Sequence, residues 1–152
     1  MKIAYKLTKP EELVKSAKEK TKNKQELTYD ECIALFAHYC KKAISFYGID
    51  PAWNITLYTN GTEEGASVSF NSRYLHAEIY MNPEYFRHNP TDIGTASVHE
   101  IAHIFLGKIH GFLQILPQEF SDENHPFNKF YEDAYEEAAT RMERLFFKYM
   151  ED

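Results

Sequence analysis

A cluster of ionisable side chains interrupts the most apolar stretch of the chain, and it limits what the chain can fold into more than any other feature. The segment from about Asp92 to Leu106 is apolar nearly all round, which predicts a helix that runs through the interior. Inside it the sequence HEIAH contributes His99, Glu100 and His103. Two imidazoles and a carboxylate in such surroundings cost several kcal/mol unless a partner satisfies them, and a bound dication is such a partner.

The spacing of these three residues is typical of a metal site with an adjacent base. Residues four apart on a helix lie about 40° apart around its axis, so His99 and His103 should emerge on one face and hold one ion. Glu100 is turned about 100° from His99, which is where a base for a metal-bound water must sit. We therefore predict His99 and His103 as metal ligands and Glu100 as the catalytic residue. The competing interpretation is three buried helix residues with separate hydrogen-bond partners.

A catalytic zinc site needs a third protein ligand, and the sequence offers more than one. Where one known spacing has a third histidine six residues after His103, this chain has Ile109, and His110 comes one residue late. The last helix offers two adjacent acids. If Ala138 lies in the middle of its apolar stripe, Glu137 flanks the stripe at about 100° and Glu136 points away at about 160°. Glu137 is therefore the predicted third ligand, and Glu136 and His110 are the alternatives.

The rest of the sequence predicts an α+β fold. Helical spacing is expected from Pro10 to about Lys20, and from the capping box at Thr28 to Gly48. Alternating runs over about 53–58, 66–70 and 75–81 then predict a three-stranded antiparallel meander with one buried face, and the third run as its edge strand. Pro83 and Pro90 mark the return to helix, and Gly107 is expected to open a loop.

The final helix is expected to bury one stripe of apolar side chains. Its members are Phe127, Tyr131, Ala134, Ala138, Met142, Leu145 and Tyr149. With a strand layer packed on helices, and with 43% hydrophobic and 26% charged residues in 152, we expect one domain over residues 1–152.

Charge and cysteine content narrow the class of protein further. The formal net charge of −6 argues against nucleic-acid binding, and the lysine run from Lys15 to Lys24 is expected to be a solvated helix face and loop. No apolar run reaches the length of a membrane span, and the first residues lack a secretory signal. Cys32 and Cys40 are about 12 Å of helix rise apart, too far for a disulfide. We therefore expect a cytoplasmic protein with reduced thiols.

At this point the sequence resembles a known family. A helix, an antiparallel meander, the HEIAH helix and a last helix with Glu137-Ala138 and then Leu145 are similar to the gluzincin-type zinc metallopeptidases, most nearly the small ImmA/IrrE-like group of phages and mobile elements. The similarity spans about Ile79 to Phe146. It implies a zincin-like fold, Zn²⁺ held by His99, His103 and Glu137, and Glu100 as the general base.

The resemblance also implies a function. The expected activity is hydrolysis of peptide bonds in a protein or peptide substrate, often a repressor or other regulatory protein in that group. The alternative is a catalytically silent zincin-fold module, such as a regulatory or anti-restriction protein, which acts by binding a partner.

Overall fold

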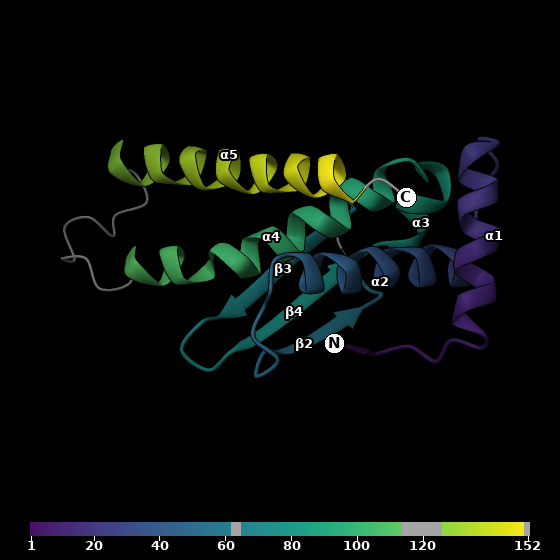
Figure 1. The fold of residues 1–152 in the computed structure, drawn as a ribbon, viewed down its shortest axis with the longest axis horizontal. Helices are drawn as coiled ribbons and strands as arrows, with labels where there is room; N and C mark the ends of the chain where they lie inside the picture. The colour runs from purple at the N-terminus through teal and green to yellow at the C-terminus, as the bar shows by residue number, and fades with distance from the viewer. Residues whose placement is uncertain (62–64, 114–125, 151–152) are drawn as a thin grey trace.

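The computed structural model describes residues 1–61, 65–113 and 126–150, and the side chains of 108–113 are outside the description. It has an α+β architecture, in which the strands form one layer and the longer helices pack over it (Figure 1). The first two helices are α1 (Pro10–Lys22) and α2 (Tyr29–Phe46), close to their predicted bounds. They are followed by α3 (Pro83–His88), α4 (Asp92–Leu113) and α5 (Pro126–Tyr149).

The capping box predicted at Thr28 is present and fixes the start of α2. The Thr28 hydroxyl accepts a hydrogen bond from the Glu31 backbone N–H at 3.2 Å, and the Glu31 carboxylate accepts one from the Thr28 N–H at 2.7 Å. At the other end, Gly48 takes a positive φ of 61°, which ends the helix as expected. The buried side of α2 therefore presents a fixed face to the core.

The predicted three-stranded antiparallel meander is wrong in strand order and direction. The strands β1 (Lys2–Ile3), β2 (Asn54–Tyr58), β3 (Ala66–Asn71) and β4 (His76–Met81) form one mixed sheet in the order β1-β2-β4-β3. β4 pairs antiparallel with β3 and parallel with β2, and β1 pairs parallel with β2. The third run of the sequence, β4, is therefore an inner strand, and β3 is the edge strand.

The connection between β2 and β3 explains this arrangement. It contains Asn60-Gly61, but in place of a tight hairpin it crosses the end of β4, where the Gly61 N–H donates to the Met81 carbonyl at 2.8 Å. The Asn82 N–H donates to the Gly65 carbonyl at 2.7 Å on the same crossing. A Cβ at Gly61 would lie 2.3 Å from the Met81 carbonyl carbon, so only glycine fits here. The alternating pattern of apolar residues predicts which face of a strand is buried. It does not predict which other strand pairs with it.

Helix α4 also differs from its expected length, because it continues through Gly107 to Leu113. A Cβ built on Gly107 would lie 2.8 Å from the Phe70 ring on β3. The glycine therefore allows a helix and an edge strand to approach closely, and it does not end the helix.

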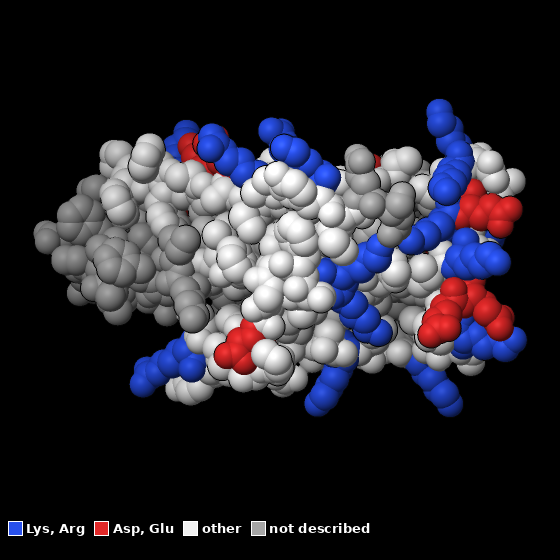
Figure 2. All heavy atoms as spheres, viewed as in Figure 1, with Lys and Arg blue, Asp and Glu red and all other residues white. Residues whose placement is uncertain are grey.

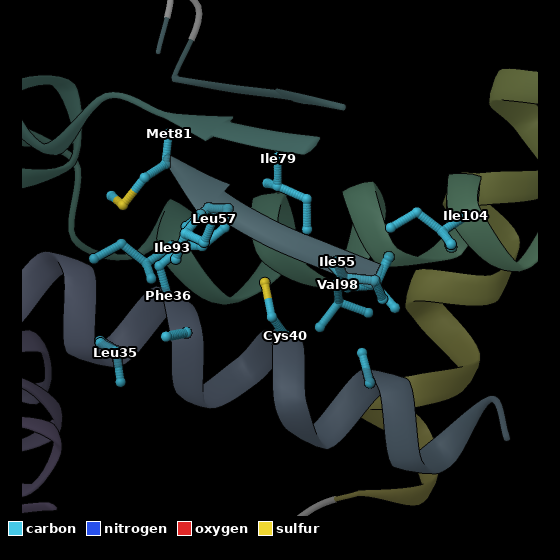
Figure 3. Packing of buried hydrophobic residues seen from close by; sticks show 14 of the residues in the cluster. Leu35, Phe36, Cys40, Ile55, Leu57, Ile79, Met81, Ile93, Val98 and Ile104 are labelled. Atoms are coloured by element: carbon cyan, nitrogen blue, oxygen red, sulfur yellow. The ribbon is translucent and has the colours of Figure 1, made fainter. Parts of the chain in front are cut away.

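Buried side chains from α2, α4 and the sheet form one apolar cluster (Figure 3). Figure 3 labels members of this cluster from the sheet (Ile55, Leu57 and Ile79), from α4 (Val98) and from α2 (Cys40). Cys40 and Cys32 are both free and buried, as predicted. Because α4 packs against α2, β3 and α5 at once, it is the element on which the other parts converge.

The buried stripe of α5 lies about one residue further along than predicted. Ala139 and Phe146 are the buried residues of this helix, whereas Leu145 and Tyr149 of the expected stripe are 42% and 65% exposed. A shift of one residue rotates a helix by about 100°, so it changes which acidic side chains face α4.

The lysine run is only partly a solvated face. Figure 2 shows Lys and Arg side chains spread over the visible surface, with acidic residues among them near α1. Lys20, by contrast, lies 2.8 Å from the buried Glu31 carboxylate. None of the helices in the described segments combines the length and the apolar character that a membrane span requires.

Candidate metal centre

Helix α4 brings the two predicted histidines together on one face. The Nε2 atoms of His99 and His103 lie 3.0 Å apart, and the ring centroids are 4.6 Å apart with an interplanar angle of 85°. Both side chains are sheltered, with 22% and 9% of their surfaces exposed. The one-turn spacing therefore produces two nitrogens that converge on one point.

The acid that joins them is Glu136 of α5. Its Oε2 lies 3.3 Å from His99 Nε2, and its Oε1 lies 3.4 Å from His103 Nε2. His99, His103 and Glu136 are the one group of three or more potential ligands that the described residues bring within 4.8 Å of one another. The structure therefore places close together three residues able to bind a metal ion.

Glu137, the predicted third ligand, lies elsewhere and is corrected here. Its carboxylate accepts a hydrogen bond from Arg141 one turn later, and its side chain is 63% exposed. The reason is the phase of α5. The prediction took Ala138 as the middle of the stripe, whereas the buried residue is Ala139, and this rotation moves Glu136 inward and Glu137 outward. The side chain of His110, the other alternative, lies outside the described residues.

The three donors fit a divalent ion in both chemistry and spacing. Two imidazoles and one carboxylate are a common set of protein ligands for catalytic zinc. Ligands about 2.0–2.1 Å from an ion at tetrahedral angles lie roughly 3.3–3.4 Å from one another. The observed donor separations of 3.0, 3.3 and 3.4 Å are close to those edges.

Glu100 is the buried acid of the site. It is 8% exposed, and the structure shows no hydrogen bond to its carboxylate from any described residue. Burial, together with the nearby negative charge of Glu136, raises the pKa of Glu100 to about 7. A buried carboxyl group without a hydrogen-bond donor is costly for stability, and such groups concentrate at functional sites.

Tyr135 links α5 to the turn of α4 that carries His103. Its hydroxyl donates to the His103 carbonyl oxygen at 2.8 Å, and its ring lies 4.9 Å from the His103 ring. The Tyr131 ring stacks on the Tyr135 ring with their centroids 5.8 Å apart, and burial raises the pKa of Tyr135. This hydrogen bond joins α5 to α4 at the residue that precedes Glu136.

These groups line a cleft of about 520 Å³ whose other wall is the edge strand β3, residues 66–70. A second hollow of about 330 Å³ continues past His99 toward Tyr85 and Asp92. His76 and Tyr80 of the inner strand β4 line neither hollow. Tyr80 instead stacks on Tyr58 and donates to Glu78.

The sequence did not predict the parts that Tyr135 and Glu143 play at this site. The Tyr135 contact was missed because its hydroxyl bonds to a backbone atom of another helix. The sequence does not predict a role for Glu143, whose Oε2 lies 3.5 Å from His99 Nδ1. An alternative α5 stripe through Tyr135, Ala139, Met142 and Phe146 was readable in the sequence and would have brought Glu136 and Glu143 forward.

Comparison with known proteins gives no match to a protein-family model, to a curated protein or to a solved structure.

Proposed function

We propose that this protein is a zinc-dependent metallopeptidase whose third ligand is Glu136. The observation that carries the proposal is the conjunction of two features in one cleft. Three potential ligands converge there at separations suited to tetrahedral coordination, and the buried Glu100 beside them has no hydrogen-bond donor among the described residues. A structural metal site has no need of such an acid.

In the proposed mechanism three residues hold the metal ion and a fourth, Glu100, transfers protons. His99 and His103 would bind the ion through Nε2, and Glu136 through a carboxylate oxygen, so the protein would supply three ligands. A dication held there supplies Lewis-acid chemistry, which polarises a carbonyl group and promotes the ionisation of water. The Glu100 carboxylate would accept the proton of the attacking water and pass it to the leaving nitrogen of the peptide bond.

The wall opposite the ligands supports a peptide as the substrate. No described strand pairs with the outer edge of β3, so this strand offers backbone N–H and C=O groups to an extended chain. The same strand lines the cleft beside His99, His103 and Glu100. A peptide added to β3 would therefore run past the candidate metal. A protein or peptide substrate, including a regulatory protein, suits this arrangement.

The test of the metal site uses two adjacent acids as a matched pair. Glu136→Ala should lose most of its bound zinc after purification and dialysis, because one of three ligands is removed. Glu137→Ala should keep the zinc content of the wild type, because that side chain is exposed and paired with Arg141. Elemental analysis of both proteins measures this. Equal zinc in the two variants would contradict the assignment of Glu136.

The test of activity uses a mixed peptide library, with new amino termini identified by mass spectrometry. We expect cleavage by the zinc-loaded wild type and by Glu137→Ala, and none after chelation or in Glu136→Ala. A wild-type protein that holds zinc but cleaves nothing, including the proteins that it captures, would contradict the peptidase and favour a binding module.

A further inference from the structure

A second acid of α5 approaches His99 from the side opposite to Glu136. Glu143 lies seven residues after Glu136, two helical turns along the same side of α5. Its Oε2 is 3.5 Å from His99 Nδ1, and its side chain is only 18% exposed. His99 is thus placed between two carboxylates of one helix, with one at each ring nitrogen.

The chemistry of imidazole gives the two acids different roles. A metal-ligating nitrogen must carry no hydrogen, and neutral imidazole keeps its one hydrogen on the other nitrogen. Nε2 faces His103 and Glu136, so it is the ligating atom, and the hydrogen belongs on Nδ1. Glu143 is the acid within reach of Nδ1, and it is on the wrong edge of the ring to bind the same ion.

We propose that Glu143 is a positioning residue that accepts the Nδ1–H of His99, and so fixes the tautomer and the ring orientation that metal binding requires. The inference rests on the proposed metal site. We expect the 3.5 Å separation to shorten to hydrogen-bond length when the metal is bound, because Nδ1 then always carries the hydrogen. Partners of this kind in other metalloproteins change metal affinity by about 10–100-fold when removed.

His103 is oriented by Tyr135 and not by Glu143. The proposed role of Glu143 therefore concerns His99 alone. The Tyr135 ring packs at 4.9 Å from the His103 ring, and its hydroxyl holds the His103 backbone carbonyl. Helix α5 therefore provides one ligand, Glu136, and a separate orienting contact for each histidine. Loss of Glu143 should disturb the geometry at His99 and leave His103 in place.

The experiment measures zinc affinity by competition with a chromophoric chelator for the wild type and three variants. We expect Glu143→Ala to bind zinc about 10–100-fold more weakly. Glu143→Gln should lie closer to the wild type, because its amide oxygen still accepts the Nδ1–H. Glu137→Ala, on the exposed side of the helix, should equal the wild type. Absorption of the Co²⁺-substituted proteins should change in Glu143→Ala and recover in Glu143→Gln.

Two controls separate a loss of zinc affinity from a loss of folding. The melting temperature of each metal-free variant shows whether α5 still packs, and a near-isosteric Glu143→Gln keeps the test valid if the alanine variant unfolds. The inference is overturned if Glu143→Ala binds zinc within twofold of the wild type, or if Glu143→Gln is as weak as Glu143→Ala. If the wild type itself binds no zinc, the proposed function fails instead, so the two failures are distinguishable.

Discussion

Glu31 of α2 and Glu100 of α4 are both buried, at 4% and 8% exposure, yet their surroundings are opposite. Burial alone would raise the pKa of Glu31, but hydrogen bonds from Lys20, Ser16 and the Thr28 backbone lower it to about 2. Glu100 has no such donors among the described residues, and burial raises its pKa to about 7.

The contrast separates an acid whose hydrogen bonds hold the fold together from an acid that the fold leaves without a described donor. Glu31 joins α1 to the beginning of α2, and every partner it has comes from these two helices or the cap between them. Glu100 contributes no described hydrogen bond to the fold and lines the cleft beside the candidate ligands. The number and kind of donors around a buried carboxylate, and not burial itself, distinguish the two roles.

The substitution Glu100→Gln is the most direct test of whether Glu100 serves catalysis and not stability, and it has the largest expected effect. We expect the peptide-cleavage rate to fall by about 10²–10⁴-fold, because the amide cannot accept the proton of water. Zinc content should be unchanged, since the ligands remain, and the melting temperature should not fall, because no described hydrogen bond is lost. Initial rates, elemental analysis and calorimetry measure the three quantities. Wild-type turnover in this variant would remove Glu100 from the mechanism.

A second expected effect concerns the pH dependence of stability through Glu31. Its pKa is lowered from 4.5 to about 2 in the folded protein, so its contribution is complete above about pH 4.5 and is lost as the pH falls through about 2. The lowered pKa corresponds to about 3 kcal/mol. Glu31→Gln should therefore be less stable than the wild type by roughly that amount at pH 7.

Denaturant unfolding at several pH values tests this. The difference between wild type and Glu31→Gln should narrow from pH 4.5 toward pH 2, whereas Glu19→Ala, an exposed acid of α1, should stay within about 0.5 kcal/mol of the wild type. A constant difference across this range would show that the carboxylate charge is not what stabilises the junction.

The smallest expected effect isolates the cap from the ion pair. Thr28→Ala removes the hydroxyl that accepts the Glu31 N–H but leaves the Thr28 N–H that donates to the Glu31 carboxylate. We expect a loss of about 1 kcal/mol in unfolding free energy and no change in zinc content. Thr28→Ser should restore the stability, since serine caps equally well. A loss as large as that of Glu31→Gln would mean that the cap and the ion pair act as one unit.

The sequence predicted those parts whose determinants are local. The cap at Thr28, the end of α2 at Gly48 and the convergence of His99 and His103 all depend on residues within about one or two turns of one another. The α+β class followed from periodicity in the same way.

The parts that failed depend on packing between distant segments. β4 is an inner strand because the β2–β3 connection crosses its end, and Gly107 lies inside α4, where its missing side chain lets Phe70 of β3 approach. The prediction of Glu137 as the third metal ligand was wrong for the same kind of reason. Two adjacent stripes of α5 are both apolar enough to be buried, and only its packing on α4 brings Ala139 inward and therefore Glu136, not Glu137, to the histidines.

The division of the donors between two helices has a consequence for the order in which the site is assembled. His99 and His103 come together as soon as one turn of α4 forms, and they would chelate an ion weakly as a pair. Glu136 reaches them only after α5 has docked on α4. A bound ion would then hold the two helices together, and its removal should weaken the docking of the carboxy-terminal helix on α4.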